Sequence, residues 1–158
     1  MTCSALGVSD QAISEGLRSY PGLPHRMERV REKDDVLFVN DSKATNPTAT
    51  APALAAFDRV RWICGGLAKT DNLDECAPHF GHVRKAYTIG EASELFASLL
   101  SPHVAVAECE TLERAVGEAA ADAEPGDTVL LSPACASFDQ FRDFEQRGDR
   151  FRELVGGL

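Results

Sequence analysis

The sequence has no run of apolar residues long enough to span a membrane. Its first 17 residues also lack the basic start and apolar centre of a signal peptide, so we expect a cytoplasmic protein with no membrane partner. Basic residues are scarce: 16 Lys and Arg stand against 25 Asp and Glu, which gives a formal net charge of −9. That charge disfavours a nucleic-acid surface. Any bound anion must then be held by local cations.

The five cysteines lack paired C-x-x-C spacing, and an odd number in a cytoplasmic chain disfavours a disulfide framework. We expect free thiols, with Cys64 and Cys109 serving as small core residues. Cys135 follows a predicted strand, but no neighbouring base would activate it, which disfavours a catalytic role. His79 and His82 have the spacing H-x-x-H without a third ligand nearby, so we interpret them as solvent-exposed loop histidines. We predict no metal site.

Two phosphate-binding motifs are also missing. No G-x-G-x-x-G follows a predicted strand, which disfavours a nicotinamide-dependent oxidoreductase. Lys69 and Thr70 follow a strand-like run, as in a Walker A loop, but Ala68 and Ile63 stand where that motif needs glycine. The chain alone therefore lacks a phosphate cradle for ATP.

What is present is a pattern of alternating helices and strands. With 158 residues, 44% of them hydrophobic, the chain can bury one core, so we predict a single α/β domain. We expect a Rossmann-like, mostly parallel sheet with helices on both faces and an N-terminal antiparallel hairpin. The predicted strands are 26–32, 35–40, 60–64, 86–89, 104–107 and 128–131, and the predicted helices are 9–19, 50–57, 91–100, 112–123 and one starting near 139.

Polar or small residues follow three of the predicted strands, at 40–46 (NDSKATN), 65–70 (GGLAKT) and 132–139 (SPACASFD). The carboxyl ends of parallel strands meet at one sheet edge, where open α/β sheets bind ligands. We therefore expect a site for two or more negative charges, with small residues letting backbone N–H groups approach an anion. The converging side chains are Lys43, Thr45, Lys69 and Ser137. The alternative is an ordinary polar loop in which Asn46 caps the next helix.

These segments resemble the C-terminal domain of the D-glutamate-adding members of the Mur ligase family, which act in peptidoglycan synthesis. The resemblance spans about residues 22–158, with the motifs in family order, and the string DSKATN is the signature of the D-glutamate-adding members. The matching segments are 22–28 (GLPHRME), 40–46, Gly65 and Gly66 with Lys69, 131–141 (LSPACASFDQF) and 144–148 (FEQRG).

The resemblance implies a role for each matching position. Thr45 and Lys69 would hold one carboxylate of D-glutamate, and Ser137 with backbone N–H groups near Phe138 and Phe144 would hold the other. Lys43 would act catalytically, between the acceptor and the nucleotide phosphate. Three residues would close over the nucleotide across an interdomain cleft: His25, Arg26 and Asp41. The alternative for Arg26 and Asp41 is a surface ion pair.

Two residues depart from the family pattern. Leu67 stands where some relatives have an acidic residue, so no ion pair there can orient Lys69, and Phe138 replaces the commoner Leu. The second change matters less because the implied contact is made by the backbone. The base that deprotonates the D-glutamate amine stays unassigned.

By the same resemblance, ATP phosphorylates the carboxylate of UDP-N-acetylmuramoyl-L-alanine, and the amine of D-glutamate attacks the acyl phosphate. ATP and Mg²⁺ would be bound mainly by a central domain, and the muramoyl nucleotide by an N-terminal domain. We expect neither domain in this chain, so the chain alone should be inactive. The alternative of a different class is a free-standing amino-acid or anion-binding module without catalysis.

Overall fold

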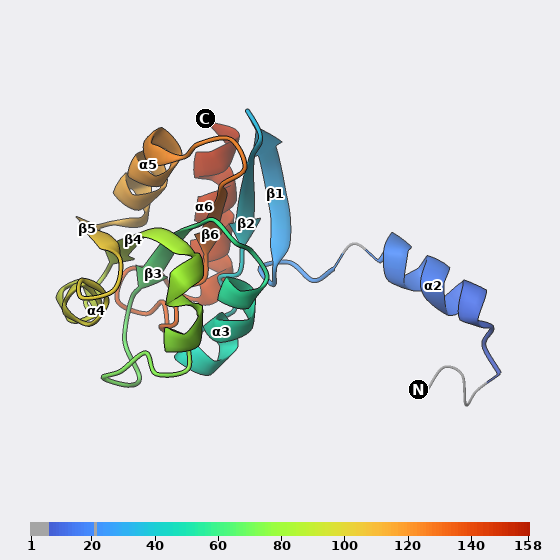
Figure 1. Ribbon diagram of the computed structural model, residues 1–158, viewed down its shortest axis with the longest axis horizontal. Helices are drawn as coiled ribbons and strands as arrows, with labels where there is room; N and C mark the ends of the chain where they lie inside the picture. Colours follow the sequence, from blue (N-terminus) through green and yellow to red (C-terminus); the bar gives the residue numbers. More distant parts are fainter. Residues whose placement is uncertain (1–6, 21) are drawn as a thin grey trace.

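The computed structural model describes residues 7–20 and 22–158 (Figure 1). In chain order the elements are α2 (Asp10–Ser19), β1 (Glu28–Lys33), β2 (Val36–Asn40), α3 (Pro47–Ala55), β3 (Val60–Gly65), the 3-10 helix η1 (Ala77–His82), β4 (Val83–Ile89), α4 (Ser93–Leu100), β5 (Ala105–Glu110), α5 (Leu112–Asp122), β6 (Thr128–Leu131) and α6 (Phe144–Gly156). None of the described helices is long and apolar enough to cross a membrane.

The strands form one six-stranded sheet in the order β1-β2-β6-β3-β4-β5. β1 and β2 pair antiparallel, and the other neighbours pair parallel. The predicted fold class, a mostly parallel sheet with an N-terminal hairpin, is confirmed. β2, β6 and β3 lie side by side and run the same way, so the segments that follow them leave from one edge of the sheet.

Side chains of the central strands alternate between two buried layers, because successive residues of a strand point to opposite faces. Val39, Trp62 and Leu130 belong to the layer under α3, η1 and α4. Phe38, Ile63 and Leu131, which are next to them along the same strands, belong to the layer under α5 and α6. Helices therefore cover both faces, as predicted (Figure 1).

Helix α2 lies away from the body of the molecule (Figure 1) and has no buried residue. The side chain of Ser9 accepts a hydrogen bond from the Ala12 amide and so caps its first turn. Leu17 and Tyr20 are exposed at this end of the chain. The predicted helix at 9–19 is confirmed; Leu17 is exposed and Ile13 is half-buried.

Several predicted boundaries are wrong: β4 begins at Val83 rather than at residue 86, and β5 ends at Glu110 rather than at residue 107. Three other boundaries are wrong for a local reason. β1 begins at Glu28 rather than at residue 26, because His25 and Met27 adopt positive φ angles of 60° and 48° in a tight turn. α3 begins at Pro47 rather than at residue 50, because Asn46 caps it by accepting from the Ala49 amide. α6 begins at Phe144 rather than near 139, because Asp143 supplies its cap.

Candidate functional site

The three predicted segments meet at the sheet edge and enclose a cavity of about 290 Å³. All six residues assigned above to D-glutamate binding or catalysis line it: Lys43, Thr45, Lys69, Ser137, Phe138 and Phe144. Ala136, Asp143 and Glu145 complete the wall. The structure thus brings together side chains that lie up to 101 positions apart in the sequence, between Lys43 and Phe144.

Five polar groups in this cavity make no side-chain hydrogen bond or ion pair with the described residues. They are the ammonium groups of Lys43 and Lys69, the hydroxyls of Thr45 and Ser137, and the carboxylate of Glu145. The side chains of Asp41, Ser132 and Arg147 are, in contrast, hydrogen-bonded within the protein. The cavity therefore presents two cations, two hydroxyls and one carboxylate to a ligand.

The signature segment 40–46 is fixed by its own short bonds. The Asn40 carboxamide oxygen accepts from the Ser42 amide at 3.1 Å, and the Asp41 carbonyl accepts from the Ala44 amide at 2.9 Å. The Lys43 amide donates to the His25 carbonyl at 2.9 Å. Asn46 then caps α3, so the ordinary-loop interpretation is correct for Asn46 itself while Lys43 and Thr45 face the cavity.

The glycines at 65 and 66 have a different role from the one predicted. Their amides donate to the carbonyls of Pro133 and Ile89, so they are not free to bind an anion. A Cβ at Gly65 would lie 2.1 Å from the Ile89 carbonyl oxygen, and one at Gly66 would lie 2.4 Å from that of Ala136. The glycines are needed because two other backbone segments pass this close. They carry Lys69 to the cavity rather than cradling a phosphate.

Arg147 is the structural residue of the site that sequence reasoning missed. Its side chain is 1% exposed and joins two of the three segments. The guanidinium donates to the Ser42 hydroxyl and carbonyl at 3.0 Å each, to the Cys135 carbonyl at 3.1 Å and to the Ala136 carbonyl at 3.3 Å. Burial lowers the pKa of Arg147 to about 10. The FEQRG motif contains this arginine, but nothing in the motif indicates that it is buried.

His25 is buried beside α6, and Arg26 is exposed. The His25 Nδ1 lies 3.1 Å from the Asn40 carboxamide nitrogen, and its ring meets the ring of Phe144 edge-on at 6.0 Å. His25 and Arg26 line a second cavity of about 330 Å³, which shares Lys43, Phe144 and Glu145 with the first. Lys43 therefore stands in the wall between the two cavities.

Asp41 lies inside the protein and is 4% exposed. Its carboxylate accepts from the Ser132 hydroxyl at 2.9 Å and from the Met27 amide at 3.1 Å. Burial raises the pKa of this carboxyl group, and the bonds from Ser132 and Met27 oppose that effect. Asp41 makes no ion pair with Arg26, so the surface-pair alternative is wrong. The contacts of Asp41 hold the turn that carries His25 and Arg26.

The cysteines and histidines can now be placed. Cys64, Cys76, Cys109 and Cys135 are buried free thiols, as predicted, while Cys3 lies outside the described residues. Burial raises the pKa of Cys135 to about 12, which keeps it protonated and supports a packing role.

The prediction of exposed loop histidines is wrong: His79 and His82 are half-buried in η1, and the His82 Nδ1 lies 2.9 Å from the Phe57 carbonyl oxygen. Within residues 7–20 and 22–158, no group of three His, Cys, Asp or Glu side chains is placed to hold a metal.

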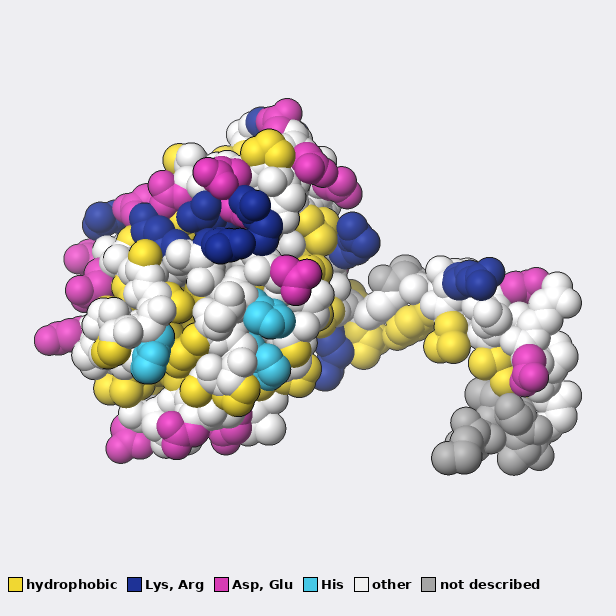
Figure 2. All heavy atoms as spheres, in the orientation of Figure 1, with side chains coloured by type: hydrophobic (Ala, Val, Ile, Leu, Met, Phe, Trp, Pro, Cys, Tyr) yellow, Lys and Arg dark blue, Asp and Glu magenta, His cyan; other side chains and the backbone are white. Residues whose placement is uncertain are grey.

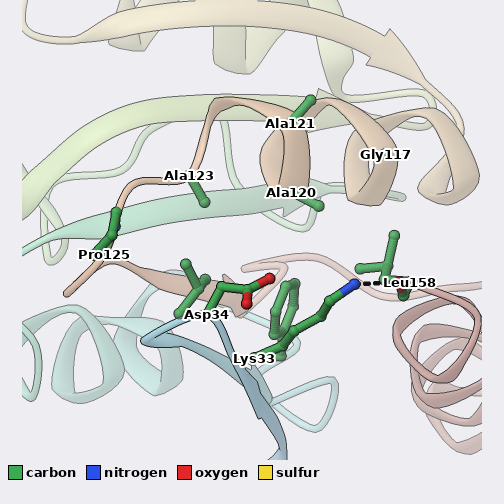
Figure 3. Close-up of a pocket in the computed structure, with 10 residues that line it drawn as sticks. Lys33, Asp34, Gly117, Ala120, Ala121, Ala123, Pro125 and Leu158 are labelled. Atoms are coloured by element: carbon green, nitrogen blue, oxygen red, sulfur yellow. Dashed lines mark hydrogen bonds between the residues drawn. The ribbon is translucent and has the colours of Figure 1, made fainter.

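A larger hollow of about 430 Å³ lies where the β1–β2 turn approaches the end of α5 (Figure 3). Its wall includes Gly117 and Ala120 of α5, and the Lys33 ammonium crosses it to the Leu158 carbonyl. None of the predicted site residues lines this hollow.

On the face shown in Figure 2, Lys and Arg side chains gather with Asp and Glu beside them. The structure has ion pairs between Arg61 and Asp127 and between Lys85 and Asp122.

Comparison with known proteins gives a consistent result. Residues 25–135 match the family described as Mur ligase, glutamate ligase domain. The chain is 61% identical over 153 residues to the UDP-N-acetylmuramoylalanine–D-glutamate ligase of Novosphingobium aromaticivorans, covering 97% of this chain and 34% of that protein. It is 55% identical to the enzyme of the same name from Zymomonas mobilis, covering 97% of this chain and 35% of that protein. The chain thus spans about a third of the length of these curated relatives.

Solved structures share the fold at low sequence identity. The UDP-N-acetylmuramate-alanine ligase of Thermotoga maritima superposes with a TM-score of 0.67 at 13% identity, over 99% of this chain and 35% of that one. The folylpolyglutamate synthase of the same organism gives a TM-score of 0.57 at 19% identity, over 99% of this chain and 37% of that one. Identities this low establish the architecture and say nothing of the ligand.

Proposed function

The chain belongs to the Mur ligase family, and from that membership we propose that it is the D-glutamate-binding C-terminal domain of an ATP-dependent ligase. The ligase would join D-glutamate to UDP-N-acetylmuramoyl-L-alanine in the cytoplasm, during peptidoglycan synthesis. Relatives that are 61% and 55% identical carry the name of that enzyme. The chain corresponds to about a third of their length, so the remaining parts of the reaction would be performed elsewhere in the polypeptide.

The observation that carries the proposal is the cavity of about 290 Å³, in which two ammonium groups and two hydroxyls have no hydrogen-bond or ion-pair partner among the described residues. D-Glutamate brings two carboxylates and one amine. Lys69 and Thr45 would hold one carboxylate by charge-assisted hydrogen bonds. The Ser137 hydroxyl, with backbone N–H groups near Phe138 and Phe144, would hold the other. Both anions would then be fixed while the amine stays directed at the acceptor.

Fixing the nucleophile in this way is a large part of the catalytic task. Holding two reactants in an attack geometry can account for about 7–11 kcal/mol of a barrier. Lys43 stands in the wall shared with the second cavity, where His25 and Arg26 would face the nucleotide. Its ammonium could there neutralise charge that develops between acceptor and phosphate. Asp41 would act indirectly, through its bond to the turn that carries His25 and Arg26.

This chain would contact ATP and Mg²⁺ from one side only. The glycines at 65 and 66 use their amides within the protein, so the loop offers no phosphate cradle. We place both mainly on the remainder of the ligase, with Arg26, His25 and Lys43 closing the site from this side. ATP supplies the phosphate that activates the acceptor's carboxylate. The purified chain alone should then neither hydrolyse ATP nor form product, as a free-standing binding module also would not.

One titration separates the ligase domain from such a module and also tests the location of the site. The complete ligase, saturated with acceptor and a non-hydrolysable ATP analogue, is titrated with D-glutamate while amide and methyl NMR signals are recorded. We expect shifts at Thr45, Ser137 and Phe138, and none with L-glutamate. Shifts confined to Gly117 and Ala120, in the 430 Å³ hollow, would contradict the proposal. Equal shifts in the absence of acceptor and nucleotide would favour the free-standing module.

A further inference from the structure

We propose that the aromatic ring of Phe144 is a positioning residue that holds the Lys43 ammonium in the wall between the two cavities. The inference concerns the ring, whereas the contact proposed above for D-glutamate uses the backbone of Phe144. Its catalytic consequence rests on the proposed function. The contact itself does not.

The Lys43 ammonium nitrogen lies 3.8 Å from the centroid of the Phe144 ring. A cation within about 6 Å of a ring centroid, over its face, is attracted by the ring quadrupole. Lys43 is exposed and makes no ion pair or side-chain hydrogen bond with residues 7–20 and 22–158. Among the described residues, the ring is therefore the partner recorded for the Lys43 ammonium, which ends a side chain with four flexible carbons.

The ring can position Lys43 because the backbone of Phe144 is hydrogen-bonded and the ring itself packs against His25. The carbonyl of Phe144 accepts from the Ser42 hydroxyl at 2.8 Å, and Arg147 donates to the same hydroxyl. The edge of the His25 ring packs against it with an interplanar angle of 79°. Asp143, one residue earlier, caps the helix that Phe144 begins. The ring thus belongs to the first residue of a capped, hydrogen-bonded helix.

His25 couples the two partners. Its carbonyl accepts from the Lys43 amide at 2.9 Å, while its ring packs against Phe144. The backbone of Lys43 and the ring beneath its ammonium therefore both contact the same buried residue, His25. Both Lys43 and Phe144 line both cavities. An ammonium kept over this ring would reach a group bound on either side without leaving its place.

The contact can be tested on the 158-residue chain without any ligand. Protons held over the face of a ring are shielded, so the Hε signals of Lys43 should lie upfield of those of the other lysines. Phe144→Tyr and Phe144→Trp should retain the shielding because they keep an aromatic face. Phe144→Leu should abolish it while the amide spectrum remains that of the folded chain. Unshielded Lys43 signals in the unmodified chain would overturn the inference.

The consequence is tested in the complete ligase by steady-state kinetics. Phe144→Leu should lower kcat about 3- to 30-fold, with a smaller change in the KM for D-glutamate because the backbone amide is kept. Phe144→Tyr should recover most of that loss. In a Lys43→Gln background, Phe144→Leu should have little further effect, since the partner of the ring is gone. Equal losses for Tyr and Leu, or additive losses in the double variant, would overturn the positioning role.

These outcomes are distinct from a failure of the proposed function. If D-glutamate bound elsewhere, substitutions at Lys69 and Ser137 would leave its KM unchanged. The shielding of Lys43 in the isolated chain would still be observed. Conversely, a normal D-glutamate site with unshielded Lys43 would refute only the inference about the ring.

Discussion

Replacing Arg147 with methionine should speed hydrogen exchange in the candidate site, while the free energy of unfolding of the domain falls only modestly. Arg147 is the side chain that joins segment 40–46 to segment 132–139 through Ser42, Cys135 and Ala136. It is 1% exposed, and no described carboxylate pairs with it. Its hydrogen bonds go to three backbone carbonyls and one hydroxyl, and the charge of Asp139 acts on it without an ion pair.

The magnitude follows from what the substitution leaves behind. The Ala136 carbonyl keeps the Leu67 amide as a donor, and the Ser42 hydroxyl keeps its bond to the Phe144 carbonyl. The carbonyls of Ser42 and Cys135 are left without the guanidinium, at about 1–3 kcal/mol each. Against this, methionine carries no charge and so avoids the cost of burying one. That burial lowers the pKa of Arg147 from 12.5 to about 10, which corresponds to roughly 3 kcal/mol. The net loss in the free energy of unfolding should be about 3 kcal/mol or less.

Arg147→Lys should be at least as destabilising as Arg147→Met. The ammonium would keep the cost of a buried charge, but as a compact point donor it would reach fewer of the four acceptors. Urea unfolding at pH 7 gives the stabilities, and hydrogen exchange of amides 41–45 and 132–139 gives the loosening. We expect faster exchange in both segments of the methionine variant, with the central strands unchanged. A lysine variant as stable as the parent, or unchanged exchange in the methionine variant, would refute the reasoning.

Two further substitutions test the supports of the site. Gly148→Ala should destabilise the chain, although alanine is normally the better helix former, because the new Cβ would lie 2.1 Å from the Nδ1 of buried His25. The matched control, Gly117→Ala in α5, meets nothing within 4 Å and should stabilise the chain by about 0.5–1 kcal/mol in thermal unfolding; the same sign for both would be contrary to this account. Asp41→Asn should remove a pH dependence of stability. Burial raises the pKa of Asp41 above its ordinary 3.8, so protonation of this group stabilises the folded state. That contribution is fully present below the unfolded-state pKa and is lost as the pH rises through the folded-state pKa. Stability measured from pH 4 to 7 should therefore fall more in the parent than in the variant, and parallel curves would be inconsistent with a raised pKa.

Much of the fold could be predicted because local signals agreed with the tertiary structure. Alternating helices and strands indicated a parallel sheet, and the apolar run before segment 40–46 became the buried strand β2. The start of α6 was misplaced because Asp139 and Asp143 are both good capping residues. In the structure Asp139 instead accepts from the Glu91 amide at 3.0 Å, a contact made across 48 residues that no local pattern reveals.

The convergence of the site residues was predictable, and the interior that holds them was not. Lys43, Thr45, Lys69 and Ser137 follow from one rule about the carboxyl ends of parallel strands. Arg147 and Asp41 were not identified as buried, because charged residues are rarely buried and sequence gives no sign of the exceptions. The glycines at 65 and 66 were correctly chosen as special positions, but the close neighbours that require them come from β4 and from segment 132–139.

The most direct test of the D-glutamate site is the kinetics of the complete ligase carrying Lys69→Ala, with each substrate varied in turn. Truncating one side of a buried or half-buried charge pair costs about 2–5 kcal/mol, so the variant should lose roughly 30-fold or more in kcat/KM for D-glutamate, mainly through KM. The KM for the muramoyl acceptor should change little. Thr70→Ala, at the exposed neighbour that does not line the cavity, is the matched control. A folded Lys69→Ala enzyme whose D-glutamate KM stays within about twofold of the parent, or that loses only acceptor affinity, would contradict the account.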